Sequence, residues 1–72
     1  MNREEFLTNF ADVLQTEEEL SFDTELESLE DWDSLAIMAT MAFLDKQFGV
    51  KTVFQDYKSM KTINDIAIKA GI

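Results

Sequence analysis

The chain has no cysteine and no histidine, and these two absences exclude most catalytic chemistry at once. It therefore has no disulfide, no thiolate nucleophile, no imidazole acid or base and none of the usual zinc ligands. Proline is also absent and glycine occurs only twice, which excludes a glycine-rich phosphate loop. We expect neither a catalytic residue nor a metal site.

Basic residues are scarce, with six Lys and Arg against fifteen Asp and Glu and a net charge of −9. A nucleic-acid-binding protein needs the opposite sign, so that class is excluded. The charge is uneven: residues 1–33 hold twelve acids and one base, a charge of −11, whereas residues 34–72 hold three acids and five bases, a charge of +2. The hydrophobic content of 46% is too high for an acidic disordered tail.

The length of 72 residues predicts a single domain, residues 1–72, with one modest core. No apolar run is long enough to span a membrane. The first residues are acidic from Glu4 onward and lack the apolar segment of a signal peptide. We expect a cytoplasmic protein that contacts neither membrane nor nucleic acid.

Apolar spacing predicts a helix over residues 3–15, with Asn2 as its N-cap. A second helix is predicted over residues 34–48, because Asp33 is a favourable N-cap and Gly49 a favourable C-terminal residue. The face predicted to be buried in the second helix consists of Leu35, Ile37, Met38, Met41, Ala42, Leu44 and Phe48. The face predicted to point outward consists of Ala36, Ala39, Thr40, Phe43, Lys46 and Gln47.

Residues 16–33 lack helical periodicity and predict a long ordered loop with a short turn near residues 23–26. Loops of this length in small domains are usually functional. A short helical turn is predicted over residues 55–59, and a last helix follows Thr62 and ends at Gly71. Four apolar residues are predicted to anchor the long loop to the core: Leu20, Phe22, Leu26 and Leu29. The expected fold is an all-α four-helix bundle with three main helices and a short third helix.

Ser34 is the candidate residue for covalent chemistry in this chain. It opens the second helix between Asp33 and Leu35, directly after the long loop. A phosphate attached at a helix N-terminus is favoured by roughly 0.3–1 kcal/mol at an exposed site. In an isolated Asp-Ser-Leu sequence, however, the commoner role of the serine is to share N-capping with the aspartate.

The chain resembles the acyl and peptidyl carrier proteins, the phosphopantetheine-binding family. The attachment signature of that family is matched by Asp33-Ser34-Leu35, and the leucine-bearing loop before it by residues 26–32. Phe48-Gly49 matches the end of the second helix, and Met60-Lys61-Thr62 matches the approach to the last helix. The first helix completes the same order of four helices, so the resemblance covers essentially the whole chain.

This resemblance implies a free-standing, monomeric carrier rather than an enzyme. A phosphopantetheinyl transferase would use coenzyme A to place 4′-phosphopantetheine on the Oγ of Ser34, with Asp33 and Leu35 completing the attachment motif. The thiol of this arm would hold an acyl or aminoacyl group as a thioester for loading and transferring enzymes. Fatty-acyl, polyketide, amino-acid and sugar-modifying pathways all remain open.

The predicted partner surface of the second helix consists of Ala36, Ala39, Phe43 and Lys46. It lacks the acids that carriers of fatty-acid synthesis display there. Phe43 either packs under the long loop or is exposed. If it is exposed, we hypothesise a dedicated pathway whose enzymes bind through apolar contact, with the acidic loop steering their approach.

A pliable acyl pocket is a further hypothesis, because thioethers adapt to irregular shapes. Its residues would be Met38, Met41, Met60 and Ile63, although methionines at helical spacing more often belong to the core. Trp32 is predicted mainly to cover the core where the loop meets the second helix, and in part to shape the surface around the arm.

Two other functional classes remain open from the residues. One is a carrier-like protein-binding module that is never phosphopantetheinylated. The other is an acidic nucleic-acid mimic that would use residues 1–33 and would not need Ser34.

Overall fold

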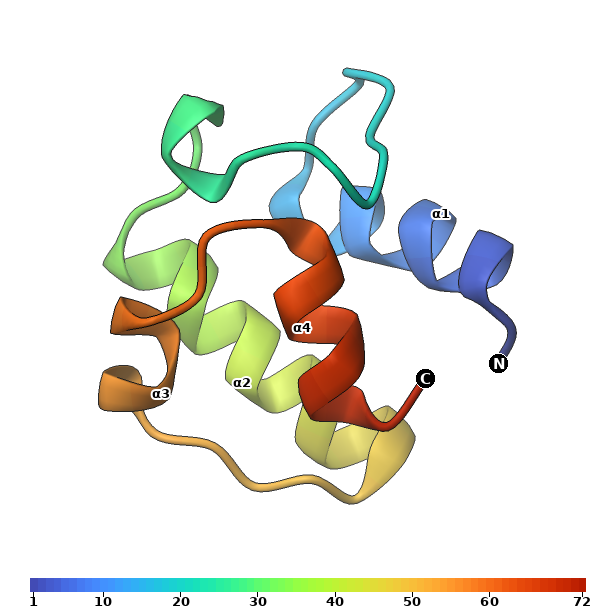
Figure 1. The fold of residues 1–72 in the computed structure, drawn as a ribbon, viewed down its shortest axis with the longest axis vertical. Helices are drawn as coiled ribbons and strands as arrows, with labels where there is room; N and C mark the ends of the chain where they lie inside the picture. Colours follow the sequence, from blue (N-terminus) through green and yellow to red (C-terminus); the bar gives the residue numbers. More distant parts are fainter.

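The computed structural model describes all 72 residues and contains four α-helices and one 3-10 turn (Figure 1). The elements are α1 (Arg3–Leu14), η1 (Leu26–Ser28), α2 (Ser34–Phe48), α3 (Phe54–Lys58) and α4 (Ile63–Ala70). There is no strand, and a long loop joins α1 to α2. The predicted all-α fold with a short third helix is therefore confirmed. None of the helices has both the length and the apolar character needed to cross a membrane.

Local signals in the sequence set the helix ends. The Asn2 Oδ1 accepts a hydrogen bond from the Glu5 N–H at 2.7 Å, and the Glu5 carboxylate accepts one from the Asn2 N–H at 3.1 Å. This reciprocal pair satisfies donors that the first turn leaves open. Gln15 ends α1 with φ 55°, and Gly49 ends α2 with φ 67°, a left-handed conformation that favours glycine. The predicted bounds of α1 and α2 are correct to within one residue.

The core lies between α1, α2 and α4, with the loop packed over it. Phe6 and Phe10 of α1 are completely buried, and their rings stack with centroids 5.8 Å apart. Helical spacing in the sequence predicts one inner face for each of these helices, and both faces are buried: Phe6, Phe10 and Leu14 of α1, and Ile63, Ile66, Ala67 and Ala70 of α4. The buried hydrophobic residues are Phe6, Phe10, Leu14, Leu26, Leu29, Ala36, Leu44, Tyr57, Ile63, Ile66, Ala67 and Ala70.

The predicted orientation of α2 is correct only in part: Leu44 is buried and three other predicted inner residues pack against the core, namely Ile37, Met41 and Phe48, but other positions differ. The helix buries Ala36, Thr40 and Leu44, whereas Leu35 and Met38, both predicted to be inside, are exposed. The side chains of Ala36 and Thr40 are small, and this lets α2 lie close to the rest of the bundle. The Thr40 hydroxyl donates to the Ala36 carbonyl oxygen at 2.8 Å, so it does not need water. Ala42, also predicted to be inside, is exposed as well.

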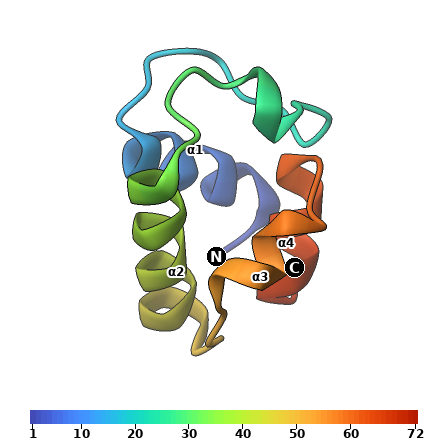
Figure 2. The ribbon, with the colours of Figure 1, turned by 90° about the vertical axis from the view of Figure 1, so that its left-hand side faces the viewer.

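The long loop is held against the start of α4. The Leu26 N–H donates to the Lys61 carbonyl oxygen at 2.8 Å, and the Ile63 N–H donates to the Thr24 carbonyl oxygen at 3.1 Å. In Figure 2 the loop arches over the end of the bundle between α2 and α4. The predicted anchoring is confirmed, since Leu26 and Leu29 are buried while Leu20 and Phe22 are partly buried. The helical turn in this loop lies at residues 26–28, slightly later than predicted.

Arg3 joins three distant segments of the chain. Its guanidinium donates to the backbone oxygen of Ile72 at 2.6 Å and to the Asn64 Oδ1 at 2.5 Å. The same group lies 4.0 Å from the centroid of the Phe22 ring, a cation–π contact. The two ends of the chain therefore lie close together, as Figures 1 and 2 both show.

Candidate functional site

The N-terminus of α2 is capped by Asp33 alone. The Asp33 Oδ1 accepts from the Ala36 N–H at 2.9 Å, and the Asp33 carbonyl oxygen accepts from the Ile37 N–H at 2.9 Å. The backbone N–H groups of Ser34 and Leu35 have no partner in the chain. Ser34 therefore does not share the capping, and two N–H groups at the positive end of the helix stay open to an anion.

The Ser34 hydroxyl is exposed and makes no hydrogen bond within the protein. The hydroxyls of the other three serines, Ser21, Ser28 and Ser59, each take part in an internal hydrogen bond. Ser34 is thus the one serine whose oxygen is both at the start of a long helix and free to form a new bond.

A hollow of about 370 Å³ lies beside Ser34, between α2, α3 and the 3-10 turn. Trp32 forms part of its wall and packs inward, with ring centroids 6.4 Å from Phe10 and 6.3 Å from Tyr57. The predicted structural role of Trp32 is confirmed. The lining residues are Leu26, Glu27, Trp32, Ser34, Ile37, Phe54, Tyr57, Lys58 and Met60.

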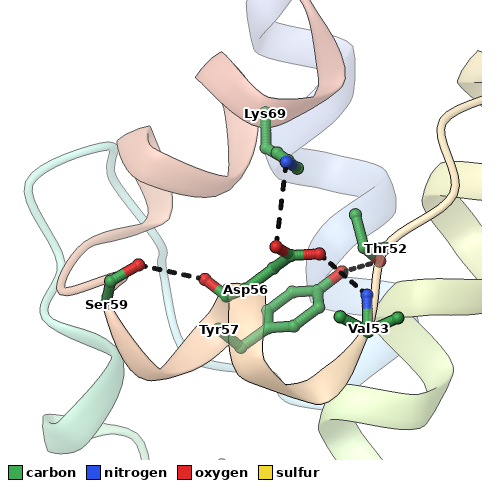
Figure 3. Close-up of polar contacts among 6 residues, drawn as sticks. All are labelled: Thr52, Val53, Asp56, Tyr57, Ser59 and Lys69. Atoms are coloured by element: carbon green, nitrogen blue, oxygen red, sulfur yellow. Dashed lines mark hydrogen bonds and ion pairs between the residues drawn. The ribbon is translucent and has the colours of Figure 1, made fainter.

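A buried polar contact fixes α3 on the far side of this hollow (Figure 3). The Tyr57 hydroxyl lies 2.8 Å from the Thr52 Oγ1. Burial raises the pKa of Tyr57, the Thr52 hydrogen bond opposes this rise, and the Asp56 charge adds to it. Tyr57 is consequently a neutral hydroxyl at ordinary pH and acts as a fixed wall rather than as a base.

Asp56 holds both ends of α3 in place. Its carboxylate accepts from the Val53 N–H at 2.8 Å and lies 3.9 Å from the Lys69 ammonium of α4. Its carbonyl oxygen accepts from the Ser59 hydroxyl at 3.3 Å (Figure 3). A helix of five residues has little stability of its own, so these contacts position the wall of the hollow.

The four residues predicted as a partner surface do not share an outward face. Ala36 is buried, with 8% of its surface exposed, and Phe43 is partly buried against the core. The Phe43 ring lies 5.8 Å from both Phe6 and Phe48, so it packs on α1 rather than under the long loop. Ala39 is partly exposed and Lys46 exposed.

The four residues predicted as an acyl pocket are also separated. Ile63 is completely buried in the core, and Met38 is 54% exposed. Met60 lines the hollow beside Ser34, whereas Met41 lines a different hollow further along α2. Phe54 lines the hollow as well and was not predicted there, because the short helical turn was expected to begin one residue later, at Gln55. The spacing of Phe54 and Tyr57, three residues apart on one helical turn, is a signal that could have revealed it.

The fold and the site together define a small helical domain that presents one unpartnered hydroxyl at a helix N-terminus. Comparison with protein families gives the same class: the family described as the phosphopantetheine attachment site matches residues 4–68. The chain belongs to this family, whose members are non-catalytic carriers of a 4′-phosphopantetheine held covalently on a serine. No curated protein and no solved structure gave a match.

The residues present fit such a group. The free hydroxyl can form the ester bond, the open N–H groups of Ser34 and Leu35 can receive phosphate oxygens, and the adjacent hollow has room beside the bond. Asp33, which is spent on capping, holds the helix end in place.

Proposed function

We propose that Ser34 is the attachment serine and that the protein carries acyl or aminoacyl intermediates as thioesters. The observation that supports this most directly is the exposed Ser34 hydroxyl, the only serine hydroxyl without an internal partner, at the first residue of α2. The thiol at the end of the arm supplies the thioester chemistry that a chain without cysteine lacks.

The attachment reaction needs only one atom of this protein. The Ser34 Oγ forms a bond to the phosphorus of coenzyme A that bears the pantetheine, 3′,5′-adenosine bisphosphate leaves, and the hydroxyl proton passes to a base of the transferase. The resulting phosphodiester carries one negative charge beside the N-terminus of α2, where the helix dipole favours it. The protein positions the oxygen, and the transferase supplies the catalysis.

We further propose that the pathway is a dedicated one and that the protein acts as a monomer in the cytoplasm. The support for a dedicated pathway is the exposed side of α2, which carries Leu35, Met38 and Ala42 rather than a row of acids. This surface differs from the acidic one expected of a carrier in bulk fatty-acid synthesis. Efficient turnover of the protein by general fatty-acid synthase enzymes would contradict this part of the proposal.

Intact-mass spectrometry tests the attachment. After incubation with coenzyme A and a broad-specificity phosphopantetheinyl transferase, the wild-type mass should rise by one phosphopantetheine. The mass of Ser34→Ala should not change, whereas the matched control Ser59→Ala should be modified like the wild type. Modification of Ser34→Ala, or no modification of the wild type by any of several transferases, would refute the proposal. The second result would favour the binding-module class.

A further inference from the structure

Two buried hydroxyls stand between two hollows of the molecule. The Tyr57 hydroxyl lies 2.8 Å from the Thr52 Oγ1, and Tyr57 is 4% and Thr52 9% exposed. In Figure 3 the two side chains point toward each other, one from α3 and the other from the segment before it. Tyr57 lines the hollow beside Ser34, whereas Thr52 lines a second hollow of about 240 Å³ further along α2.

A count of protons shows that this pair has one donor to spare. Each oxygen has a hydrogen-bond partner, namely the other oxygen, but two hydroxyls carry two protons and share a single hydrogen bond. One proton is therefore donated within the pair, and the other has no acceptor in the chain. A buried O–H group without an acceptor destabilises the fold, because it has given up its hydrogen bond to water. The spare proton belongs either to Tyr57 or to Thr52.

The hollow on the Tyr57 side suits a neutral group with an acceptor oxygen. Its wall is largely apolar and aromatic, with Trp32 and Phe54 among the lining residues. Glu27 and Lys58 line it as well, so neither a carboxylate nor an ammonium group meets charges of one sign there. An amide fits this environment, since its carbonyl oxygen accepts a hydrogen bond and carries no net charge.

We propose that Tyr57 holds the phosphopantetheine arm by donating its hydroxyl proton to an amide carbonyl oxygen of the arm, while Thr52 donates to the Tyr57 oxygen. The inference rests on the proposed function, because the arm reaches this hollow only from Ser34, which lines it. Trp32 and Phe54 supply an apolar wall for the geminal methyl groups of the arm. Each hydroxyl keeps its own proton, and no covalent bond forms or breaks.

The donor is in place before the arm is attached. The Asp56 carboxylate accepts from the Val53 N–H at 2.8 Å and lies 3.9 Å from the Lys69 ammonium, so α3 is fixed at its first turn and against α4. The Trp32 ring lies 6.3 Å from that of Tyr57 and limits its movement. Burial raises the pKa of Tyr57, so the hydroxyl keeps its proton at ordinary pH. A preorganised donor of this kind spends little conformational entropy on binding.

Two substitutions of conserved shape test the proposal. Tyr57→Phe and Thr52→Val both break the same hydroxyl pair, but only the first removes the donor to the arm. Wild type and variants are converted with coenzyme A and a transferase, and intact mass verifies complete modification. NMR then compares each modified protein with its own unmodified form. The signals followed are the amides of Phe54 and Met60 and the indole N–H of Trp32, the single tryptophan of the chain.

In the wild type, attachment should shift these signals, and nuclear Overhauser effects should connect the methyl groups of the arm with the Trp32 ring. Tyr57→Phe should lower the ratio of docked to free arm by roughly fivefold, the effect of one neutral hydrogen bond, and the shifts should shrink accordingly. Thr52→Val should retain the wild-type shifts, because Tyr57 still has its proton and the arm is then its only acceptor. Circular dichroism checks that both variants are folded.

Three results would overturn the proposal. Equal loss in both variants would show that the pair only supports the wall, and loss in Thr52→Val alone would assign the spare proton to Thr52. Absence of the Overhauser effects in the modified wild type would show that the arm does not enter the hollow, whatever the variants do. The mass measurement separates this inference from the function on which it rests. No gain in mass would refute both, whereas a gain in mass without contact in the hollow would refute the role of Tyr57 alone.

Discussion

Leu26→Ala tests how the loop before Ser34 is held. Leu26 is 1% exposed in the 3-10 turn and lines the hollow beside Ser34. Truncating a fully buried leucine to alanine typically costs about 2–5 kcal/mol. A domain of 72 residues has a total free energy of unfolding of about 4–11 kcal/mol. Because alanine keeps the backbone hydrogen bond to Lys61, we expect a loss of about 3 kcal/mol rather than complete unfolding.

The measurement is urea denaturation followed by circular dichroism and, in parallel, by the fluorescence of Trp32. The control is Ile68→Ala, which truncates a side chain that is 62% exposed and should change stability by less than about 0.5 kcal/mol. If Leu26→Ala lost no more stability than Ile68→Ala, the long loop would not be an anchored part of the fold. The 3-10 turn would then not be a fixed wall of the hollow beside Ser34 either.

Three further substitutions probe other contacts. Hydrogen bonds from two backbone N–H groups lower the pKa of Asp65 in the folded protein. The contribution of Asp65 to the free energy of unfolding is therefore fully present above its unfolded pKa of about 4, and it is lost as the pH falls through the folded pKa. The urea midpoint of Asp65→Asn should therefore fall less on acidification than that of the wild type; an identical fall would contradict this assignment. Phe43→Ser should lower the free energy of unfolding in urea by about 2–4 kcal/mol, whereas Leu35→Ser should lower it by less than about 0.5 kcal/mol. Equal losses would indicate that Phe43 points outward instead. Arg3→Lys keeps the charge but loses the planar two-donor geometry, and should lower stability by about 1 kcal/mol; no change in melting temperature would show that the contacts of Arg3 contribute nothing.

The helix positions were predictable because their end signals are local. Asn2, Asp33 and Gly49 act through neighbours within one turn of the helix, so their effect does not depend on the rest of the fold. The inner faces of α1 and α4 were also predictable, since the apolar residues of each recur at helical spacing.

The orientation of α2 was not predictable in the same way, because this helix is apolar almost all around. Its sequence from Leu35 to Leu44 contains no charged residue, so periodicity does not identify one face. Tertiary packing decides which face of α2 is buried. The face that contacts the bundle needs small side chains, and Ala36 and Thr40 provide them. Phe43 then contacts Phe6, a residue far away in sequence, which no local pattern reveals.

In the candidate site, too, local features were predictable and features set by tertiary packing were not. The sequence identifies Ser34 as the candidate, because its place after an N-cap is a local feature and its motif resembles a family pattern. The hollow beside it was not predicted, because its walls come from five separate places in the chain: the 3-10 turn, Trp32, α2, α3 and Met60. Such an assembly depends on how the segments pack, and the predicted methionine pocket failed to anticipate it since it relied on side-chain chemistry alone.

The division of charge along the chain coincides with the proposed attachment residue. Asp33 is the last residue of the acidic half, and Ser34 is the first residue of the half that carries +2. This boundary in the sequence is not a boundary between two surfaces, because Glu27 lines the same hollow as Lys58 and Asp45 lines the same hollow as Lys51. The fold brings acids and bases from both halves together near α2. The sum of charges along a stretch of sequence is therefore a poor guide to the local charge that a partner meets beside Ser34.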